Sequence, residues 1–179
     1  NAVAGVAFAD ADGTAYTRTY IASQPDKVMA ARYTAAGANT MSMRFSVEPG
    51  APLCSLSPVK PEVTYSDGEA TFSGKLELIS YASQMSVSAD EGATVTTGKD
   101  GITVSNAREI IIYVTGATDY DGSNAFTFTN GKAIHLVADM NNRIRQAKTK
   151  SWQQLLDAHI ADFRSYMARV QFGLTVNGK

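Results

Sequence analysis

Short runs of alternating side chains, separated by tight turns, are the feature that most constrains the fold of this 179-residue chain. Residues 14–21 read T-A-Y-T-R-T-Y-I, a period of two that places Tyr16, Arg18 and Tyr20 on one face of a strand. Similar short runs follow at residues 28–34, 41–47, 70–78, 85–89, 94–97, 102–105 and 109–115. We therefore expect a mainly β fold.

Turn signals and one uninterrupted apolar run indicate how these strands are arranged. Asp12-Gly13, Asp67-Gly68 and Asp100-Gly101 each lie between two runs, and Asp-Gly pairs suit the tight turn of an antiparallel hairpin. The run from Ile110 to Val114 lacks alternation, which predicts a strand covered on both faces in the middle of a layered structure. Many short strands with frequent turns predict an antiparallel β-sandwich.

After Thr118 the apolar residues recur at helical spacings of three and four. The first predicted helix carries the stripe Ile134, Val137, Met140, Ile144 and Ala147. A second is expected to begin at Ser151, which with Gln154 forms the pattern of a capping box. Its stripe is Trp152, Leu156, His159, Phe163, Met167 and Val170. The sandwich is therefore expected to be followed by two C-terminal α-helices.

The charge pattern argues against two classes of partner. The chain has 16 Lys and Arg against 17 Asp and Glu, a net charge of -1, and no run of five residues carries one sign of charge. We therefore expect no binding of nucleic acid or of an anionic membrane surface. The longest nearly uncharged apolar stretch, Ile110 to Ala117, is far shorter than the ~20 residues of a membrane-spanning helix, so no membrane insertion is expected.

Metal-binding patterns are absent from the sequence. Cys54 is the only cysteine, so no intrachain disulfide can form. His135 and His159 are the only histidines, and each lies within a predicted helix beside apolar neighbours, as a structural histidine does. No His-x3-His or Cys-x2-Cys spacing occurs, whereas a zinc site needs at least three convergent ligands. We expect neither a metal nor another cofactor.

Two short motifs have a simpler interpretation than the chemistry they resemble. Asp10-Ala11-Asp12-Gly13 is similar to the start of a calcium loop, but Ile21 stands where the loop needs a glutamate, so a hairpin turn is favoured. Ser57-Pro58-Val59-Lys60 matches the Ser-x-x-Lys pattern of penicillin-binding enzymes. In those enzymes the serine opens a helix, whereas Pro58 and Pro61 predict a loop here.

The carboxylate pairs also have a structural explanation. Asp90 with Glu91, and Asp119 with Asp121, lie in predicted turns or loops, where Asp side chains commonly bind their own backbone. We therefore assign no catalytic residue, no cofactor-binding residue and no metal-binding residue to this chain.

Two arginines and three tyrosines remain as surface candidates. Arg18 and Arg32 can pair with acids across adjacent strands, line a surface groove or contact another domain. Tyr16, Tyr20 and Tyr33 can form a platform that stacks sugars if they share an exposed face. Packing in the core or at an interface is the favoured interpretation of the tyrosines.

Three segments carry a resemblance to glycoside hydrolase family 95, the alpha-L-fucosidase family. The first, Y-T-R-T-Y-I-A-S-Q-P-D-K-V-M-A-A-R-Y-T-A, spans residues 16–35. The second is N-A-R-E-I-I-I-Y-V-T-G-A-T-D-Y at residues 106–120, and the third is S-W-Q-Q-L-L-D-A-H-I-A-D-F-R-S-Y-M-A-R-V at residues 151–170. They resemble the family's segments in order and spacing, and together they span nearly the whole chain.

The resemblance implies a domain of a larger bacterial enzyme. Residues 1–128 would be part of its N-terminal β-sandwich domain, and residues 129–179 a helical segment that starts the linker to an (α/α)6 barrel. The chain begins without an initiator Met, so we expect a piece of a longer protein. The implied location is secreted or periplasmic.

The same resemblance implies the chemistry of the parent protein, which is hydrolysis of terminal alpha-L-fucosides with inversion. A glutamate acts there as general acid, and an Asn and Asp pair positions the water. Inversion separates the carboxyl groups by ~6.5 to 9.5 Å so that water fits between them. These residues belong to the family's barrel and match no position here, so this chain is expected to be a non-catalytic accessory domain.

The expected partners are the barrel of the same parent chain, the parent's glycan substrate and, for the isolated chain, other copies of itself. Two alternatives remain open. One is a free-standing carbohydrate-binding or cell-surface β-sandwich module, and the other is the sandwich domain of another (α/α)6 enzyme, such as a phosphorylase relative. Two helices after the last strand favour a domain that continues into another.

Overall fold

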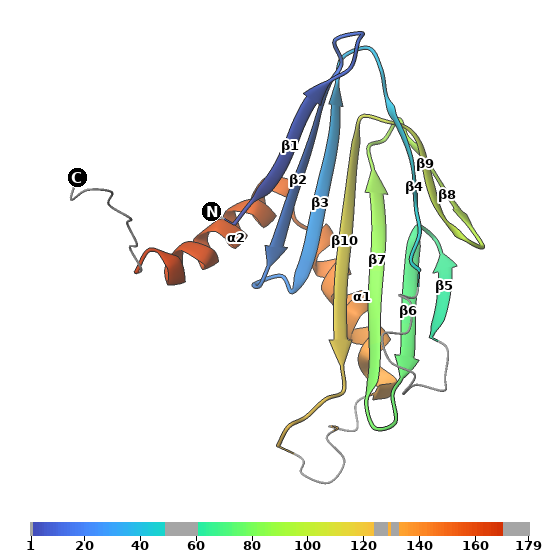
Figure 1. Ribbon diagram of the computed structural model, residues 1–179, viewed down its shortest axis with the longest axis vertical. Coiled ribbons are helices and arrows are strands. Elements are labelled where there is room, and N and C mark those ends of the chain that lie inside the picture. Colours follow the sequence, from blue (N-terminus) through green and yellow to red (C-terminus); the bar gives the residue numbers. More distant parts are fainter. Residues whose placement is uncertain (1, 49–60, 124–128, 130–132, 170–179) are drawn as a thin grey trace, which may run out of the picture.

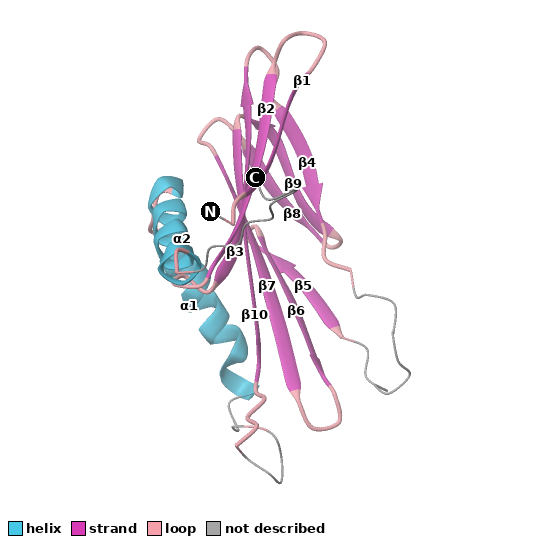
Figure 2. Ribbon diagram, turned by 60° about the vertical axis from the view of Figure 1, so that its left-hand side comes forward, coloured by secondary structure: helices cyan, strands magenta, loops and turns pink. Residues whose placement is uncertain are grey.

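Two antiparallel sheets and a pair of helices form three layers in the computed structural model, which describes residues 2–48, 61–123, 129 and 133–169. The seven-stranded sheet lies in the middle, with the three-stranded sheet on one side and both helices on the other (Figure 1, Figure 2). The predicted mainly β sandwich followed by two C-terminal helices is confirmed.

The seven-stranded sheet joins two groups of consecutive strands through one strand that comes late in the sequence. Its order is β1 (Ala4–Ala9), β2 (Ala15–Ser23), β3 (Val28–Ala36), β10 (Glu109–Thr118), β7 (Ser80–Ala89), β6 (Glu69–Lys75) and β5 (Glu62–Ser66). The smaller sheet has the order β4 (Met41–Phe45), β9 (Gly101–Ala107) and β8 (Thr94–Gly98). All neighbouring strands pair antiparallel.

The three Asp-Gly pairs lie at hairpin turns, as predicted, although Gly101 is already the first residue of β9. They connect β1 to β2, β5 to β6 and β8 to β9. At the second turn, Asp67 and Gly68 both have positive φ, 50° and 76°, as the two central residues of a type I′ turn require. These turns fix the register of the three pairs.

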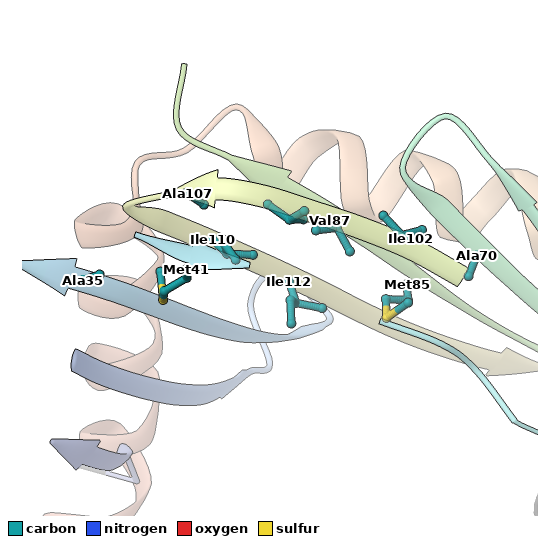
Figure 3. Packing of buried hydrophobic residues seen from close by; sticks show 10 residues of the cluster. Ala35, Met41, Ala70, Met85, Val87, Ile102, Ala107, Ile110 and Ile112 are labelled. Atoms are coloured by element: carbon teal, nitrogen blue, oxygen red, sulfur yellow. The ribbon is translucent and has the colours of Figure 1, made fainter. Parts of the chain in front are cut away.

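Strand β10 is covered on both faces, which explains its uninterrupted apolar run. Ile110 and Ile112 point into the core between the two sheets, whereas Tyr113 packs on the helix side (Figure 3). The prediction of a central, doubly covered strand is confirmed. In the sandwich core, Ile102 and Val104 of β9 are fully buried against the larger sheet.

The helical layer begins with a 3-10 turn, Ala133–His135, and continues as α1 (Leu136–Lys148). Leu136, Met140, Ile144 and Ala147 are the buried residues of α1. The predicted stripe is therefore wrong at Val137, because Leu136 faces the sheet instead, and the side chain of its first member, Ile134, lies outside the described residues. Residues 136, 140 and 144 are four apart and so form one line along the helix.

Helix α2 (Trp152–Met167) begins at the predicted capping box. The Ser151 side chain accepts a hydrogen bond from Gln154 N, and the Gln154 side chain accepts one from Ser151 N. Leu155 and His159 are its buried residues, so the predicted stripe omitted the fully buried Leu155. The apolar face of such a helix is wider than a line of single residues, and Leu156 flanks it.

Polar contacts fasten the helices to the sheet. Lys150, between the helices, forms an ion pair with Asp26 in the turn from β2 to β3. On α1, Lys148 donates a 3.0 Å hydrogen bond to Ser86 Oγ of β7. Neither helix of the described chain is long and apolar enough to cross a membrane.

Two strands were not predicted, and two predicted runs, 41–47 and 70–78, extend past their strands, which end at Phe45 and Lys75. Strand β1 consists mostly of Ala and Gly, and strand β5 is a five-residue edge strand, so neither gives a strong periodic signal. The run predicted at residues 70–78 ends at Lys75, because Leu76 and Leu78 lie in the exposed turn before β7.

Candidate functional site

A groove on the inner face of the seven-stranded sheet is the best candidate for a binding site among the described residues. It measures about 260 Å³ and lies between strands β1 to β3 and the segment that leads into β4. We call it the Arg18 groove. Its lining consists of aromatic, hydroxyl and thioether side chains around one arginine: Phe8, Tyr16, Thr17, Arg18, Tyr33, Thr40, Met41, Ser42 and Met43.

Strand register brings the rings of this groove together. Phe8 of β1 pairs with Tyr16 of β2, and Arg18 pairs with Tyr33 of β3. The Phe8 and Tyr16 rings stack at 5.2 Å between centroids. The Arg18 guanidinium carbon lies 5.5 Å from the Phe8 centroid and 5.7 Å from the Tyr33 centroid. Both distances are within the ~6 Å range of a cation–π contact.

Tyr33 connects the aromatic rings of the groove to those nearer the core. It meets Tyr20 edge to face, with 6.0 Å between ring centroids, and Phe45 at 6.5 Å. Burial raises the pKa of Tyr33 to about 12, and a hydrogen bond with Tyr20 adds to the rise. The phenol is therefore neutral at physiological pH and acts as a hydrogen-bonding group.

The three tyrosines singled out from the sequence do share a face, but they are half-buried rather than exposed. Tyr16 and Tyr33 pack against the sandwich core, as the favoured interpretation expected. Phe8, which is 46% exposed, offers the more accessible ring, and sequence reasoning missed it. The Asp12-Gly13 hairpin is the signal that could have revealed it, because a hairpin requires a strand before the turn.

The two arginines lie on opposite faces of the larger sheet. Arg32 faces the helices, where its Nε donates a 2.7 Å hydrogen bond to Glu109 and its guanidinium lies 6.0 Å from the Trp152 ring centroid. Arg18 instead lines the groove. Of the roles considered for the arginines, cross-strand pairing with an acid therefore applies to Arg32 and groove lining to Arg18.

Asp10 holds the turn at one end of the cluster. It accepts hydrogen bonds from the backbone N of Asp12 and Thr14, from the Tyr16 hydroxyl and from Asn39 Nδ2. The bond from Asn39 is the main reason that the pKa of Asp10 is lowered. The geometry is that of a hairpin turn, the interpretation favoured over a calcium loop.

The other aspartates considered also bind backbone groups. Asp90 accepts 2.8 Å bonds from the backbone N of Arg108 and Glu109. Asp119 accepts one from Ser80 N, and Asp121 accepts one from Ser123 N. Within the described ranges no group of three His, Cys, Asp or Glu side chains is arranged to hold a metal.

The structural role expected of both histidines is wrong for His135, which is exposed, and fits only the buried His159. His135 is exposed at the end of the 3-10 turn, whereas His159 is buried with its Nε2 3.0 Å from the carbonyl O of Ala2. Cys54 and the Ser57 to Lys60 motif lie outside the described residues.

An open apolar pocket lies beside the Arg18 groove on the same face of the sheet. It measures about 480 Å³, and Tyr20, Met29, Ala31, Ile112 and Val114 are among its lining residues. Its lining has no charged side chain, and the Tyr20 hydroxyl is its side-chain polar group. The groove is the better candidate because it combines rings with a cation.

Comparison with known proteins gives the context of this site. Residues 1–123 match the family model described as glycosyl hydrolase family 65, N-terminal domain. A solved structure described as a candidate kojibiose phosphorylase from the human microbiome has a similar fold, with a TM-score of 0.60 and 11% sequence identity. The likeness covers 90% of this chain and 23% of that one. No curated protein matches the sequence.

Proposed function

We propose a non-catalytic supporting role for this chain, which belongs to the family of glycosyl hydrolase family 65 N-terminal domains. The family match over residues 1–123 is the observation that carries the proposal. The chain spans 23% of the similar solved structure, so a parent of comparable length would hold its catalytic residues in other domains. The supporting domain would contact an (α/α)6 barrel of the same chain.

The finer proposal is a bacterial parent of the alpha-L-fucosidase type, secreted or periplasmic. It is supported by the three segments that resemble family 95. The first forms β2 and β3, the second forms β10, and the third forms α2. Strands β2, β3 and β10 are neighbours in the sheet, and α2 packs on β2, so the three segments form one contiguous unit.

A second candidate is the sandwich domain of a phosphorylase. It is favoured by the family match, which is to glycosyl hydrolase family 65 and not to family 95. It is also favoured by the likeness in fold to a candidate kojibiose phosphorylase. At 11% identity that likeness concerns the fold and not the substrate. A free-standing module is less favoured, because α1 and α2 follow the last strand and α2 extends past the edge of the sheet (Figure 1).

The coding sequence downstream of Lys179 tests the proposal. A barrel carrying a general-acid glutamate with an Asn and Asp pair would support the fucosidase type. A phosphate-binding catalytic domain would support the phosphorylase. A stop codon directly after Lys179 would overturn the supporting role and favour the free-standing module.

An activity assay separates the parent from the supporting domain. The full-length parent should hydrolyse an aryl alpha-L-fucoside, and the purified 179-residue chain should not exceed the rate in buffer. The matched comparison is an aryl alpha-glucoside with and without inorganic phosphate. Turnover by the short chain that is lost on changing one of its own carboxylates would contradict the non-catalytic role.

A further inference from the structure

We infer that the Arg18 groove binds one sugar ring. The sugar would lie against the exposed ring of Phe8, and Arg18 would donate hydrogen bonds to two neighbouring hydroxyl groups. We draw this from the groove and from the glycoside hydrolase family, whatever linkage the parent cleaves.

The first support is the unused hydrogen-bonding capacity of Arg18. A guanidinium carries five N–H donors in a fixed fork. Within the described part of the chain, the contacts of the Arg18 guanidinium are the rings of Phe8 and Tyr33, and no oxygen accepts a hydrogen bond from it. Arg32 on the other face of the same sheet shows the contrast, because its guanidinium is taken up by Glu109.

The second support is that Arg18 is held in place before any ligand arrives. Phe8 and Tyr33 lie on neighbouring strands on either side of β2 and both contact its guanidinium. Phe8 is in turn stacked on Tyr16. A side chain already ordered loses less conformational entropy on binding, so a weak ligand such as a sugar gains affinity from this arrangement.

The third support is the character and size of the groove. Rings and methionine side chains supply apolar surface, and Thr40 and Ser42 are polar residues of the lining, although the Ser42 hydroxyl already accepts a 3.4 Å hydrogen bond from Asn106 N. This mixture of apolar walls with a few polar groups is typical of small-molecule sites. The groove volume of about 260 Å³ is below the ~300 to 1,000 Å³ of pockets that hold drug-sized ligands. This size suits a single ring rather than an oligosaccharide.

A pyranose with vicinal hydroxyls fits these features better than a simple anion. Its C–H face can cover the Phe8 ring while two adjacent oxygens accept hydrogen bonds from the Arg18 fork. An inorganic anion would engage Arg18 alone and leave the 46% exposed Phe8 ring uncovered. The two chemistries can therefore be told apart by what happens at Phe8.

The test is a titration of the isotope-labelled 179-residue chain, followed by the backbone amide signals in NMR spectra. L-Fucose, D-galactose and D-glucose are the sugar probes, and acetate and inorganic phosphate are the anion probes. At least one sugar should cause saturable shifts at Phe8, Arg18 and Met43 at millimolar concentrations. The anions should cause no matching shift at Phe8.

Two groove variants and one matched control complete the design. Phe8→Ala should weaken sugar binding by about three- to tenfold, through loss of the stacking surface. Arg18→Gln should weaken it at least as much, and it provides a second result if Phe8→Ala disturbs the edge strand. Tyr166→Ala is the control, because Arg169 also lies over that ring, at 5.6 Å, but on α2 outside the groove.

Three outcomes would overturn the inference. They are no saturable shift with any sugar, shifts at Phe8 with anions alone, and sugar binding unchanged in folded Phe8→Ala and Arg18→Gln. None of these would affect the supporting role, which is tested by the downstream sequence and by the activity of the parent.

Discussion

Asp26 illustrates how one buried carboxylate fastens two layers together. Only 4% of its side chain is exposed, and it pairs with Lys150 and accepts a 2.6 Å hydrogen bond from Ser23 Oγ. Replacing Lys150 with Met would leave the buried charge without its cation. We expect the free energy of unfolding to fall by about 1–3 kcal/mol, measured by urea denaturation.

Lys99 provides the matched comparison. It forms an ion pair with Asp100, but the two side chains are 91% and 64% exposed. Lys99→Met should change the free energy of unfolding by no more than about 1 kcal/mol. Equal losses of unfolding free energy in Lys150→Met and Lys99→Met would show that burial of Asp26 adds nothing to the strength of its ion pair.

Tyr33 should make stability sensitive to alkaline pH. Because its pKa is raised from 10.0 to about 12 in the folded chain, the folded state holds the phenol proton more tightly than the unfolded state does. The resulting contribution of Tyr33 to the free energy of unfolding is fully present below pH 10 and is lost as the pH rises towards 12. The pKa values of Tyr16 and Tyr113 are also raised by burial, so they act in the same direction.

The melting temperature should therefore fall with pH between 10 and 12, and Tyr33→Phe should make the fall less steep. The same substitution at the exposed Tyr166 should leave the slope unchanged. A slope identical in wild type and Tyr33→Phe would contradict a raised pKa at Tyr33.

For single residues, the sequence predicts which face of a strand a side chain lies on better than it predicts which side chains that residue contacts. The period of two correctly placed Tyr16, Arg18 and Tyr20 on one face, because alternation is a local property of a strand. The approach of Phe8 to Arg18 depends on strand register across the sheet. The Arg32 to Glu109 pair joins residues 77 apart, which local periodicity cannot reveal.

Among the elements, the β8–β9 hairpin depends on one glycine. A Cβ at Gly101 would lie 2.7 Å from the backbone O of Phe45 on β4, so an alanine would push apart the β4 and β9 strands. We expect Gly101→Ala to lower the free energy of unfolding by about 1–3 kcal/mol in urea titrations.

The control lies in the same turn. The nearest atom to a Cβ at Gly98 is the O of Gly101 at 3.7 Å, an ordinary contact. Gly98→Ala should stay within about 0.5 kcal/mol of wild type. A comparable loss at both glycines would locate the strain in the turn and not against β4.

The two halves of helix α2 should contribute differently to the free energy of unfolding. Leu155 is fully buried beneath the first half, whereas Met167 at the end is 50% exposed. Leu155→Ala should lower the free energy of unfolding by about 2–5 kcal/mol, and Met167→Glu should leave it nearly unchanged. We expect the exposed end of α2 to promote self-association of the isolated chain, so Met167→Glu should also reduce any dimer seen by sedimentation velocity.

If Met167→Glu destabilised the sandwich by several kcal/mol, the end of α2 would be part of its core. The segment 129–179 would then not be a separate linker segment. The contacts of Leu155 with the sheet-side cluster already show that the first half of α2 packs on the sandwich.

Element type was predictable where periodicity was strong. The capping box fixed the start of α2 to the residue, because Ser151 and Gln154 act within one turn. Strand β1 was missed because its alanines and glycine give little contrast between the two faces. The difference between Val137 and Leu136 depends on how α1 is rotated against the sheet, which the stripe alone leaves open.

For the molecule as a whole, we expect stability to be independent of divalent metal. Asp90 and Asp119 are engaged by backbone groups, and the described residues hold no group of three His, Cys, Asp or Glu side chains arranged for a metal. Thermal melting with zinc, calcium or a chelator should give one midpoint. A clear rise at micromolar metal would indicate a site that binds the folded state.

The layered architecture was predictable, but the unequal sizes of the two sheets were not. The uninterrupted run at Ile110 to Val114 correctly indicated a strand covered on both sides. The division into seven and three strands depends on which hairpins join which sheet. Turn residues specify each hairpin but not its neighbours, so the position of the Arg18 groove on the inner face of the larger sheet could not be predicted from the sequence.

The late position of β10 has a consequence for synthesis on the ribosome. Strand β3 ends at Ala36, and its partner on that side, β10, is complete only at Thr118. At ~5–20 residues per second, the intervening stretch of roughly 80 residues takes about 4–16 s to emerge. Throughout that interval the edge of β3 has no partner from its own chain. During that interval the unpaired edge of β3 can pair with another chain, which a chaperone bound to the nascent protein would prevent.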